Sequence, residues 1–410
     1  MATFNFLGTL SVPKDTDKFH SFEITESSKG TGWLMIHNRF NVSERDSRHF
    51  VSIDGGKFKD EHNVIYITPD DDKNLPKCVQ RKISDSGKES FYINYSDRKN
   101  PDVLALLPRY RKKLLDLNSK ALRYMLKSIG EKLENNDSLN PDELKALGAE
   151  SMADAKAAYD KACRKRMEFL DAYDFAEMVK KAFDNGAFAN RKVRVTGTVD
   201  CSYSEAKDRF YENYEVDSIE IVDAEDEEYG HLNVKFLYGA NAVTETDDKL
   251  VIRGHHMTHI GNPLNRQVPK DIGFVFPITE ANKEMADGLK SRFEVLDDDV
   301  IKARAVVLDV IDGSPKLEIT EDMLTDEQKE DLKWGFTTKE ELAREFGDDL
   351  RGERITELRF AKWGRGGTAP EDTAFKPDQM NFINPNIKQE TAPAVEESAK
   401  TDDDDVDLFS

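Results

Sequence analysis

The clearest pattern in the chain is an alternation of apolar and polar residues that opens the stretch from Arg191 to Arg253. Val193, Val195 and Val199 alternate with Arg and Thr, the period of two that puts one face of a strand in a core and the other in water. Gly197 lies in the middle of this strand, where a glycine often allows a sharp bend or a bulge. Three further strand-like runs follow, with turn residues between them. The stretch therefore predicts a small antiparallel barrel of the OB type.

Residues 1–100 are predicted to form a β-rich domain of short strands joined by glycine turns. In the run from Trp33 to Val42, Trp33 and Arg39 share the face opposite the apolar residues. An aromatic ring and a cation on an open strand face suit the stacking of nucleic-acid bases. The alternative is that Trp33 covers a hydrophobic edge.

Residues 101–188 are predicted to be helical, because leucines recur there at helical spacing. Asn140 to Glu143 has the pattern of a helix cap, and so does Thr325 to Gln328 further along the chain. One long helix is expected from Ser151 to Phe183, ending at Asn185 and Gly186. Residues 189–367 form the predicted OB-like domain, which includes the strand that ends at Trp363. The predicted fold class is α+β: an antiparallel, OB-like β-barrel core with a β-rich N-terminal region, a helical insertion and a disordered acidic tail.

The formal net charge of the 410-residue chain is −21, whereas proteins that bind nucleic acid usually contact phosphate through a basic surface. From Asn386 to Ser410 there are eight acids against two lysines, so most of the negative charge lies elsewhere. A DNA-binding face must then be a local basic strip on an acidic body. Two basic clusters, Arg109 to Lys113 and Arg164 to Arg166, are either solvated helix faces or phosphate contacts.

The sequence predicts no catalytic site, no metal site and no cofactor, and hence a protein that is not an enzyme. His255 and His259 are four residues apart, but the surrounding glycines and proline argue against the helix that this spacing would need. The three cysteines are scattered, and no phosphate-binding or nucleophile motif is present. No apolar run reaches the roughly 20 residues of a membrane span, and the start of the chain is unlike a signal peptide. The expected location is the cytoplasm, or the host cytoplasm for a viral protein.

The chain ends in TDDDDVDLFS, an acidic run placed directly before two apolar residues, Leu408 and Phe409. Residues 368–410 are rich in Pro, Ala, Glu, Asn and Asp, which predicts a disordered linker and tail. Such an end suits docking of Phe409 in a pocket while the aspartates meet a basic rim. The same tail can fold back on a cationic DNA groove and compete with phosphate.

This tail resembles that of single-stranded DNA-binding proteins from bacteria and their phages, whose acidic C-terminal peptides end in phenylalanine or a similar apolar residue. The stretch from Arg191 to Arg253 is similar to the OB-fold portion of large-phage members. Ser410 is a departure, because the family commonly ends on the aromatic residue itself. The resemblance implies a bacteriophage protein that coats single-stranded DNA cooperatively and without sequence preference in replication, recombination and repair. The oligomeric state is left open.

The resemblance also implies that the tail recruits replication proteins, such as a polymerase, helicase or primase. The residues assigned to this contact are Asp402, Asp403, Asp404, Asp405, Asp407, Leu408 and Phe409. Two other functions fit the sequence. One is an RNA-binding OB-fold module, and the other is an acidic replisome adaptor or scaffold that binds proteins only.

The predicted DNA-binding residues lie opposite the core positions of the central strands or at their connecting turn. Stacking of a base on an aromatic ring contributes ~1–3 kcal/mol and tolerates any sequence, while Arg and Lys follow the phosphates. The residues chosen on this basis are Arg194, Tyr203, Arg209, Tyr211, Lys235 and Arg253, extended by Trp33 and Arg39.

Overall fold

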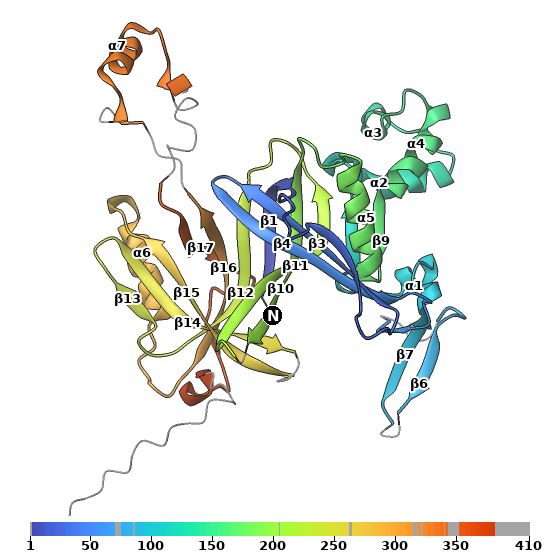
Figure 1. Ribbon diagram of the computed structural model, residues 1–410, viewed down its shortest axis with the longest axis horizontal. Helices are drawn as coiled ribbons and strands as arrows, with labels where there is room; N and C mark the ends of the chain where they lie inside the picture. Colours follow the sequence, from blue (N-terminus) through green and yellow to red (C-terminus); the bar gives the residue numbers. More distant parts are fainter. Residues whose placement is uncertain are drawn as a thin grey trace, which may run out of the picture.

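A computed structural model of the chain describes residues 2–69, 75–84, 87–204, 206–261, 265–314, 319–320, 323–339, 341–342 and 352–381 (Figure 1). A large sheet of 15 strands runs through the molecule, a three-stranded sheet lies at one end, and helices flank both. The predicted tail, residues 402–410, lies outside the described residues.

The strands of the large sheet come from most of the described chain. They are β1 (Thr3–Ser11), β2 (Phe22–Glu26), β3 (Trp33–Glu44), β4 (Ser47–Phe58), β8 (Lys113–Asp116), β9 (Arg166–Phe169), β10 (Lys192–Ser204), β11 (Arg209–Ile221), β12 (Tyr229–Tyr238), β13 (Val243–Glu245), β14 (Lys249–Ile260), β15 (Arg266–Pro277), β16 (Lys302–Gly313), β17 (Ile355–Trp363) and β18 (Glu371–Asp372). The small sheet has the order β5-β7-β6, from β5 (Val64–Ile67), β6 (Gln80–Ile83) and β7 (Glu89–Asn94).

The described helices are α1 (Pro101–Ala105), α2 (Lys120–Glu134), α3 (Pro141–Leu147), α4 (Met152–Arg164), α5 (Ala172–Asp184), α6 (Lys283–Phe293) and α7 (Asp326–Trp334). Short 3₁₀ turns are η1 (Tyr95–Asp97), η2 (Arg109–Arg111), η3 (Glu280–Asn282) and η6 (Pro377–Met380). The capping boxes predicted at Asn140 to Glu143 and Thr325 to Gln328 are both confirmed, at the starts of α3 and α7.

The predicted antiparallel, OB-like barrel within residues 189–367 is wrong. The strands of this range belong to the large sheet, which is mixed and does not form a barrel. β1, from the start of the chain, lies between β10 and β12, with Phe4 opposite both Gly197 and Leu232. β11 pairs in parallel with β4 and β8, from two other parts of the chain. Alternation of residue types sets the faces of a strand, but it carries no information about a partner that is distant in sequence.

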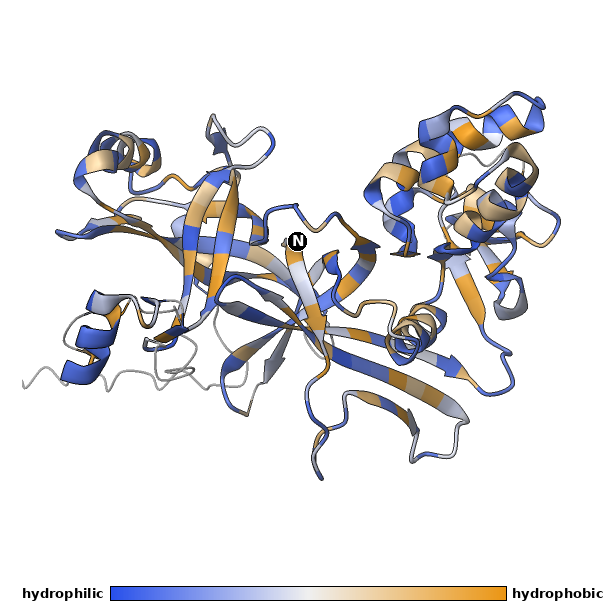
Figure 2. Cartoon of the chain, turned by 90° about the horizontal axis from the view of Figure 1, so that it is seen from above, coloured by the Kyte–Doolittle hydropathy of each residue, from blue (hydrophilic) through white to orange (hydrophobic). Residues whose placement is uncertain are grey.

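The strand faces themselves are confirmed. Val193 and Val195 are fully buried and Val199 nearly so, and Figure 2 shows hydrophobic and hydrophilic bands alternating along the long strands. The register of β10 and β11 shifts beside Gly197, as its position predicted. A Cβ atom there would lie 1.9 Å from the Glu215 carbonyl oxygen, so a larger residue would force the strands apart.

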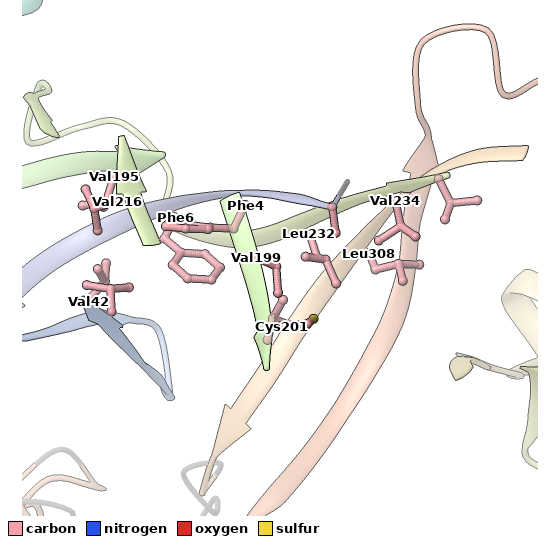
Figure 3. Packing of buried hydrophobic residues seen from close by; sticks show 14 of the residues in the cluster. Phe4, Phe6, Val42, Val195, Val199, Cys201, Val216, Leu232, Val234 and Leu308 are labelled. Carbon is pink, nitrogen blue, oxygen red and sulfur yellow. The ribbon is translucent and has the colours of Figure 1, made fainter. Parts of the chain in front are cut away.

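One hydrophobic core joins the N-terminal strands to the central ones. Phe4 and Phe6 from β1 pack among Val195 and Val216 on one side and Leu232 on the other (Figure 3). α5 adds Phe175 and Val179 to this core, whereas α2, α3 and α4 form a separate small cluster with its own apolar residues. The predicted domain ranges 1–100 and 189–367 thus share a sheet and a core.

The long helix expected from Ser151 to Phe183 is wrong. α4 ends at Arg164, β9 follows and pairs with β8, and α5 begins at Ala172. Asp171 caps α5 by accepting hydrogen bonds from the N–H groups of Tyr173 and Asp174. The helix is interrupted because β9 pairs with β8, a strand distant in sequence. Helical periodicity gives no information about such a partner. None of the described helices is long and apolar enough to cross a membrane.

Candidate nucleic-acid interface

Three of the predicted DNA-binding residues come together where β10 turns into β11. Tyr203 packs against Phe210 with ring centroids 5.0 Å apart and donates a hydrogen bond to Asp208. The Arg209 guanidinium lies over the Tyr211 ring, 5.5 Å from its centroid, and both residues are exposed. This end of the hairpin therefore presents a cation and an aromatic ring to solvent.

Of the other residues chosen on the central strands, Arg194 and Lys235 make ion pairs and Arg253 borders a hollow. Arg194 is nine residues from Tyr203 along β10, about 30 Å at the rise of a strand, and donates to Glu220 at 2.7 Å. Lys235, on β12, donates to Glu371 at 2.6 Å. Arg253 is exposed on β14 beside a hollow of about 710 Å³. That hollow shares Asp271, Met380 and Asn381 with a second hollow, which is lined by Tyr203 and Phe210 of the hairpin.

Trp33 and Arg39 both lie on β3, and both are half-buried. The Trp33 indole N–H donates to the Met35 sulfur at 2.9 Å, and its ring packs edge-on against Phe58 with centroids 4.8 Å apart. Arg39 lies 6.0 Å from the centroid of the Phe19 ring. Trp33 thus makes the contacts of a residue that covers a hydrophobic edge.

A more open aromatic surface lies on the small sheet. On one face Ile67 and Ile93 are buried with Val103 of α1. On the opposite face Tyr66 and Tyr92 are cross-strand neighbours with ring centroids 6.0 Å apart. Tyr66 is 61% exposed, a large value for an aromatic residue in a sheet. The pair gives two adjacent rings on which unpaired bases could stack.

A lysine lies on the same face of the small sheet as this pair of rings. Lys82 lies opposite Ser90 in the register of β6 and β7, and therefore shares the outer face with Tyr92. Lys77, Lys82 and Lys88 make no ion pair with any residue that the structure describes. Residues 75–113 carry ten Lys and Arg against four acids, in a chain with a net charge of −21. The acidic run at residues 70–72, in the β5 to β6 connection, lies outside the described residues.

We call the small sheet, η1, α1 and η2 the basic lobe. Its last part is the basic cluster at residues 109–113, where Tyr110 is 78% exposed and the Arg111 guanidinium lies 5.8 Å from the Tyr110 ring centroid. In the other cluster, at residues 164–166, Arg166 donates to the fully buried Asp116 at 3.1 Å. In the first cluster Arg109 and Arg111 are exposed, whereas Lys112 and Lys113 are largely buried and pair with Glu168 at 2.6 Å and Asp217 at 2.8 Å. Each cluster therefore contains cations that are tied to carboxylates.

A buried ion pair fastens the basic lobe to α5. Arg98, just after η1, donates to both carboxylate oxygens of Asp174 at 2.6 and 3.2 Å, and its guanidinium lies 3.8 Å from the Tyr95 ring centroid. Both charged side chains are 7% exposed. Burial acts to raise the pKa of Asp174, but the hydrogen bonds from Arg98 and Lys99 outweigh it, and the pKa is lowered.

Two further contacts complete this attachment. Arg98 also donates to Glu61, before β5, at 3.3 Å, and Tyr95 donates to Asp171 at 2.8 Å. Burial raises the pKa of Asp171. The contacts from Arg98 and Tyr95 fix the direction in which the basic lobe presents its open face.

Sequence reasoning did not select Tyr66, Tyr92 or Lys82. Strands were expected at Tyr66 and Tyr92 but not at Lys82, and each of the three strands is only four to six residues long, too short to tell the buried face from the open one. The alternation of Ile65 and Ile67 with Tyr66 was the available indication. Among the described residues, no group of three or more His, Cys, Asp or Glu side chains is arranged to hold a metal ion. His255 and His259 lie on a strand, β14.

No family model matches this chain, and no curated protein matches it. Among solved structures, the chain is similar to a deletion mutant of the single-stranded DNA binding protein from Thermus aquaticus. The alignment covers 76% of this chain and 87% of that chain, with 7% sequence identity and a TM-score of 0.27. At that TM-score we infer neither fold nor function from the likeness.

Proposed function

We propose that this protein binds single-stranded DNA without sequence preference, with the basic lobe as its principal contact surface. The observation that supports the proposal is a pair of neighbouring rings, the exposed Tyr66 and the half-buried Tyr92, on the same face as Lys82, which makes no ion pair within the described residues. Positive charge gathered around open rings on an acidic chain is the arrangement that a single strand requires.

The chemistry of this surface favours single strands over duplexes. A base can stack on Tyr66 or Tyr92 only when its own face is free, and in a duplex the neighbouring base pairs occupy that face. Lys77, Lys82 and Lys88 would meet phosphates, which are common to all sequences. The exposed Arg209 and Tyr211 on the β10 to β11 hairpin are a candidate second contact for a longer strand.

The wider role included in this proposal is the coating of single strands in replication, recombination and repair. In it, the residues from Asp402 to Phe409 recruit replication proteins. This part rests on the resemblance of the acidic tail to that of single-stranded DNA-binding proteins.

The test is a fluorescence anisotropy titration with labelled oligo-dT, matching duplex DNA and oligo-U. We expect tight binding of the wild-type protein to oligo-dT and weak binding to duplex. Replacing Tyr66 and Tyr92 together by alanine should weaken oligo-dT binding at least tenfold, because each lost stack costs ~1–3 kcal/mol. Tyr124→Ala is the matched control, since Tyr124 is 74% exposed on α2, away from the basic lobe.

Three results would overturn the proposal. They are equal affinity for duplex and oligo-dT, tighter binding to oligo-U than to oligo-dT, and an unchanged affinity of the double tyrosine variant. An unchanged affinity of the double tyrosine variant would mean that DNA binds elsewhere than on the basic lobe. Either of the other two results would mean that the preferred ligand is not single-stranded DNA.

A further inference from the structure

The large sheet has a gap where β15 and β17 diverge. Within the described residues these parallel strands pair only at Val275 and Arg359. Residues 270–273 and 356–358 line a cavity of about 490 Å³ between them. Its remaining walls come from β4, β11 and β16, with Leu232 from β12. We call this cavity the β15–β17 cleft.

The strand edges that face the cleft carry no other strand in the described structure. β15 is paired with β14 along its whole length on its other side, and β17 is paired with β16. Backbone N–H and C=O groups at such edges are a template for an added strand. The cleft therefore fits an extended segment better than a helix.

The cleft is lined by acidic side chains. Four acidic residues line it, Glu212, Asp271, Asp312 and Glu357, together with Lys270, which donates to Glu212. Glu357 also accepts from Arg359, which is 38% exposed. Asp271 is 96% exposed, and its one ion-pair partner among the described residues is His255, at 3.0 Å. Arg354, which contacts Asp312 at 2.7 Å, is itself 69% exposed, so an incoming cation can replace it.

The basic lobe presents the complementary strand. β6 is an outer strand of the small sheet and all four of its residues are exposed. Lys82 gives it positive charge, while Arg81 is paired with Glu89 of β7. The Ser84 N–H donates to the Lys88 carbonyl oxygen at 2.9 Å. Hydrogen-bonded pairs alternate in an antiparallel ladder, so Ile83 directs its N–H and C=O away from β7. Its side chain, 62% exposed, can meet the apolar residues of the cleft.

We infer that β6 of one molecule adds to the β15–β17 cleft of a second copy of the chain. Figure 1 shows β6 and β7 projecting at one end of the molecule and β15 and β17 lying at the other. The contact is therefore between different surfaces, and repetition of such a head-to-tail contact builds an open chain of molecules. The inference stands on the protein surface alone and does not rest on the proposed DNA binding.

The test is sedimentation velocity without DNA, at low salt and rising protein concentration. We expect the wild-type protein to form species larger than a dimer. The cleft variant Asp271→Lys and the lobe variant Ile83→Pro, which removes one outward N–H, should each sediment as monomers. An equimolar mixture of the two should form a dimer and nothing larger, because only one intact cleft can meet one intact β6.

Several results would overturn the inference: a monomeric wild-type protein at every concentration, variants that associate like the wild type, or a mixture that stays monomeric. Asp137→Lys makes the same charge change at an exposed position outside the cleft and should associate like the wild type. If Ile83→Pro fails to fold by circular dichroism, Arg81→Glu replaces it as the lobe variant. Because this experiment contains no DNA, a failure of the self-association inference would not contradict the proposal of single-stranded DNA binding. A failure of the DNA-binding proposal would likewise not contradict the self-association inference.

Discussion

The basic lobe and the β15–β17 cleft both have strand edges that remain open. They differ in the sign of their charge and in the sheet to which they belong. The outer face of the lobe's small sheet holds the exposed Tyr66, the half-buried Tyr92 and the exposed Lys82. The cleft is a gap inside the large sheet, lined by four carboxylates. An acidic chain can thus carry surfaces of opposite sign. Net charge sets the average attraction for phosphate, whereas the local cations decide where a strand can bind.

The largest effect is expected from breaking the attachment of the lobe. Arg98→Met leaves Asp174 charged, buried and without its main partner, which should cost about 3–5 kcal/mol of unfolding free energy. Urea denaturation followed by circular dichroism measures this loss. The affinity for oligo-dT should fall as well, while the β15–β17 cleft stays intact. The variant therefore perturbs the lobe without perturbing the cleft.

Lys99→Met is the matched control for Arg98→Met. It removes a second contact to Asp174, at 3.1 Å, from a side chain that is 64% exposed. Such a partly exposed pair contributes only about 0.2–1 kcal/mol. Equal losses in the two variants would contradict the view that the buried Arg98 holds the lobe.

A smaller effect is expected from reversing the charge of the lobe. Replacing Lys77, Lys82 and Lys88 by glutamate should weaken oligo-dT binding more than tenfold at moderate salt. If each lysine meets one phosphate, the slope of log affinity against log salt should fall by about 2. Lys127, Lys156 and Lys161, exposed on α2 and α4, give a control triple variant with the same charge change. An equal loss in both triple variants would mean that overall charge, and not the lobe, governs binding.

The smallest effect concerns Glu215, on β11 beside the strand that follows the lobe. Burial raises the pKa of Glu215 to about 7, against the opposing effect of Lys113 at 3.4 Å. The folded protein therefore favours the protonated acid. This contribution to stability is complete below the ordinary glutamate pKa and is lost as the pH rises through about 7.

Glu215→Gln should accordingly raise the Tm relative to wild type by a few degrees at about pH 8 and by less at about pH 5. Thermal unfolding at the two pH values measures the difference. An offset that is the same at both pH values would show that the titration of Glu215 does not contribute to stability.

What the sequence could predict was local. The alternation of Val193 and Val195 fixed the buried face of β10, Gly197 marked its irregularity, and Asn140 and Thr325 marked helix starts. The partners of these strands were not predictable, because the insertion of β1 beside β10 joins residues nearly 200 positions apart. The expected barrel failed for that reason.

The same limit applies to the candidate site: local features were predictable, but contacts between strands were not. Arg209 and Tyr211 were chosen from their own strand, and they are exposed together as neighbours on it. Arg194 was chosen in the same way, but its ion pair with Glu220 depends on the register of two strands. Tyr66 and Tyr92 were not predicted, because packing on α1 decides which face of the small sheet stays open.

The attachment through Arg98 also bears on how the molecule opens in its native state. The basic lobe has its own small cluster of apolar residues, separate from the main core. Contacts of this kind allow a segment to detach as a cooperative unit while the rest stays folded, and amide hydrogen exchange reports such openings. Backbone amides of β5, β6 and β7 should then exchange together, ahead of those in β10 and β12. Each such opening would break the Arg98–Asp174 pair and expose both buried charges to water, so this one contact would set how often the lobe detaches.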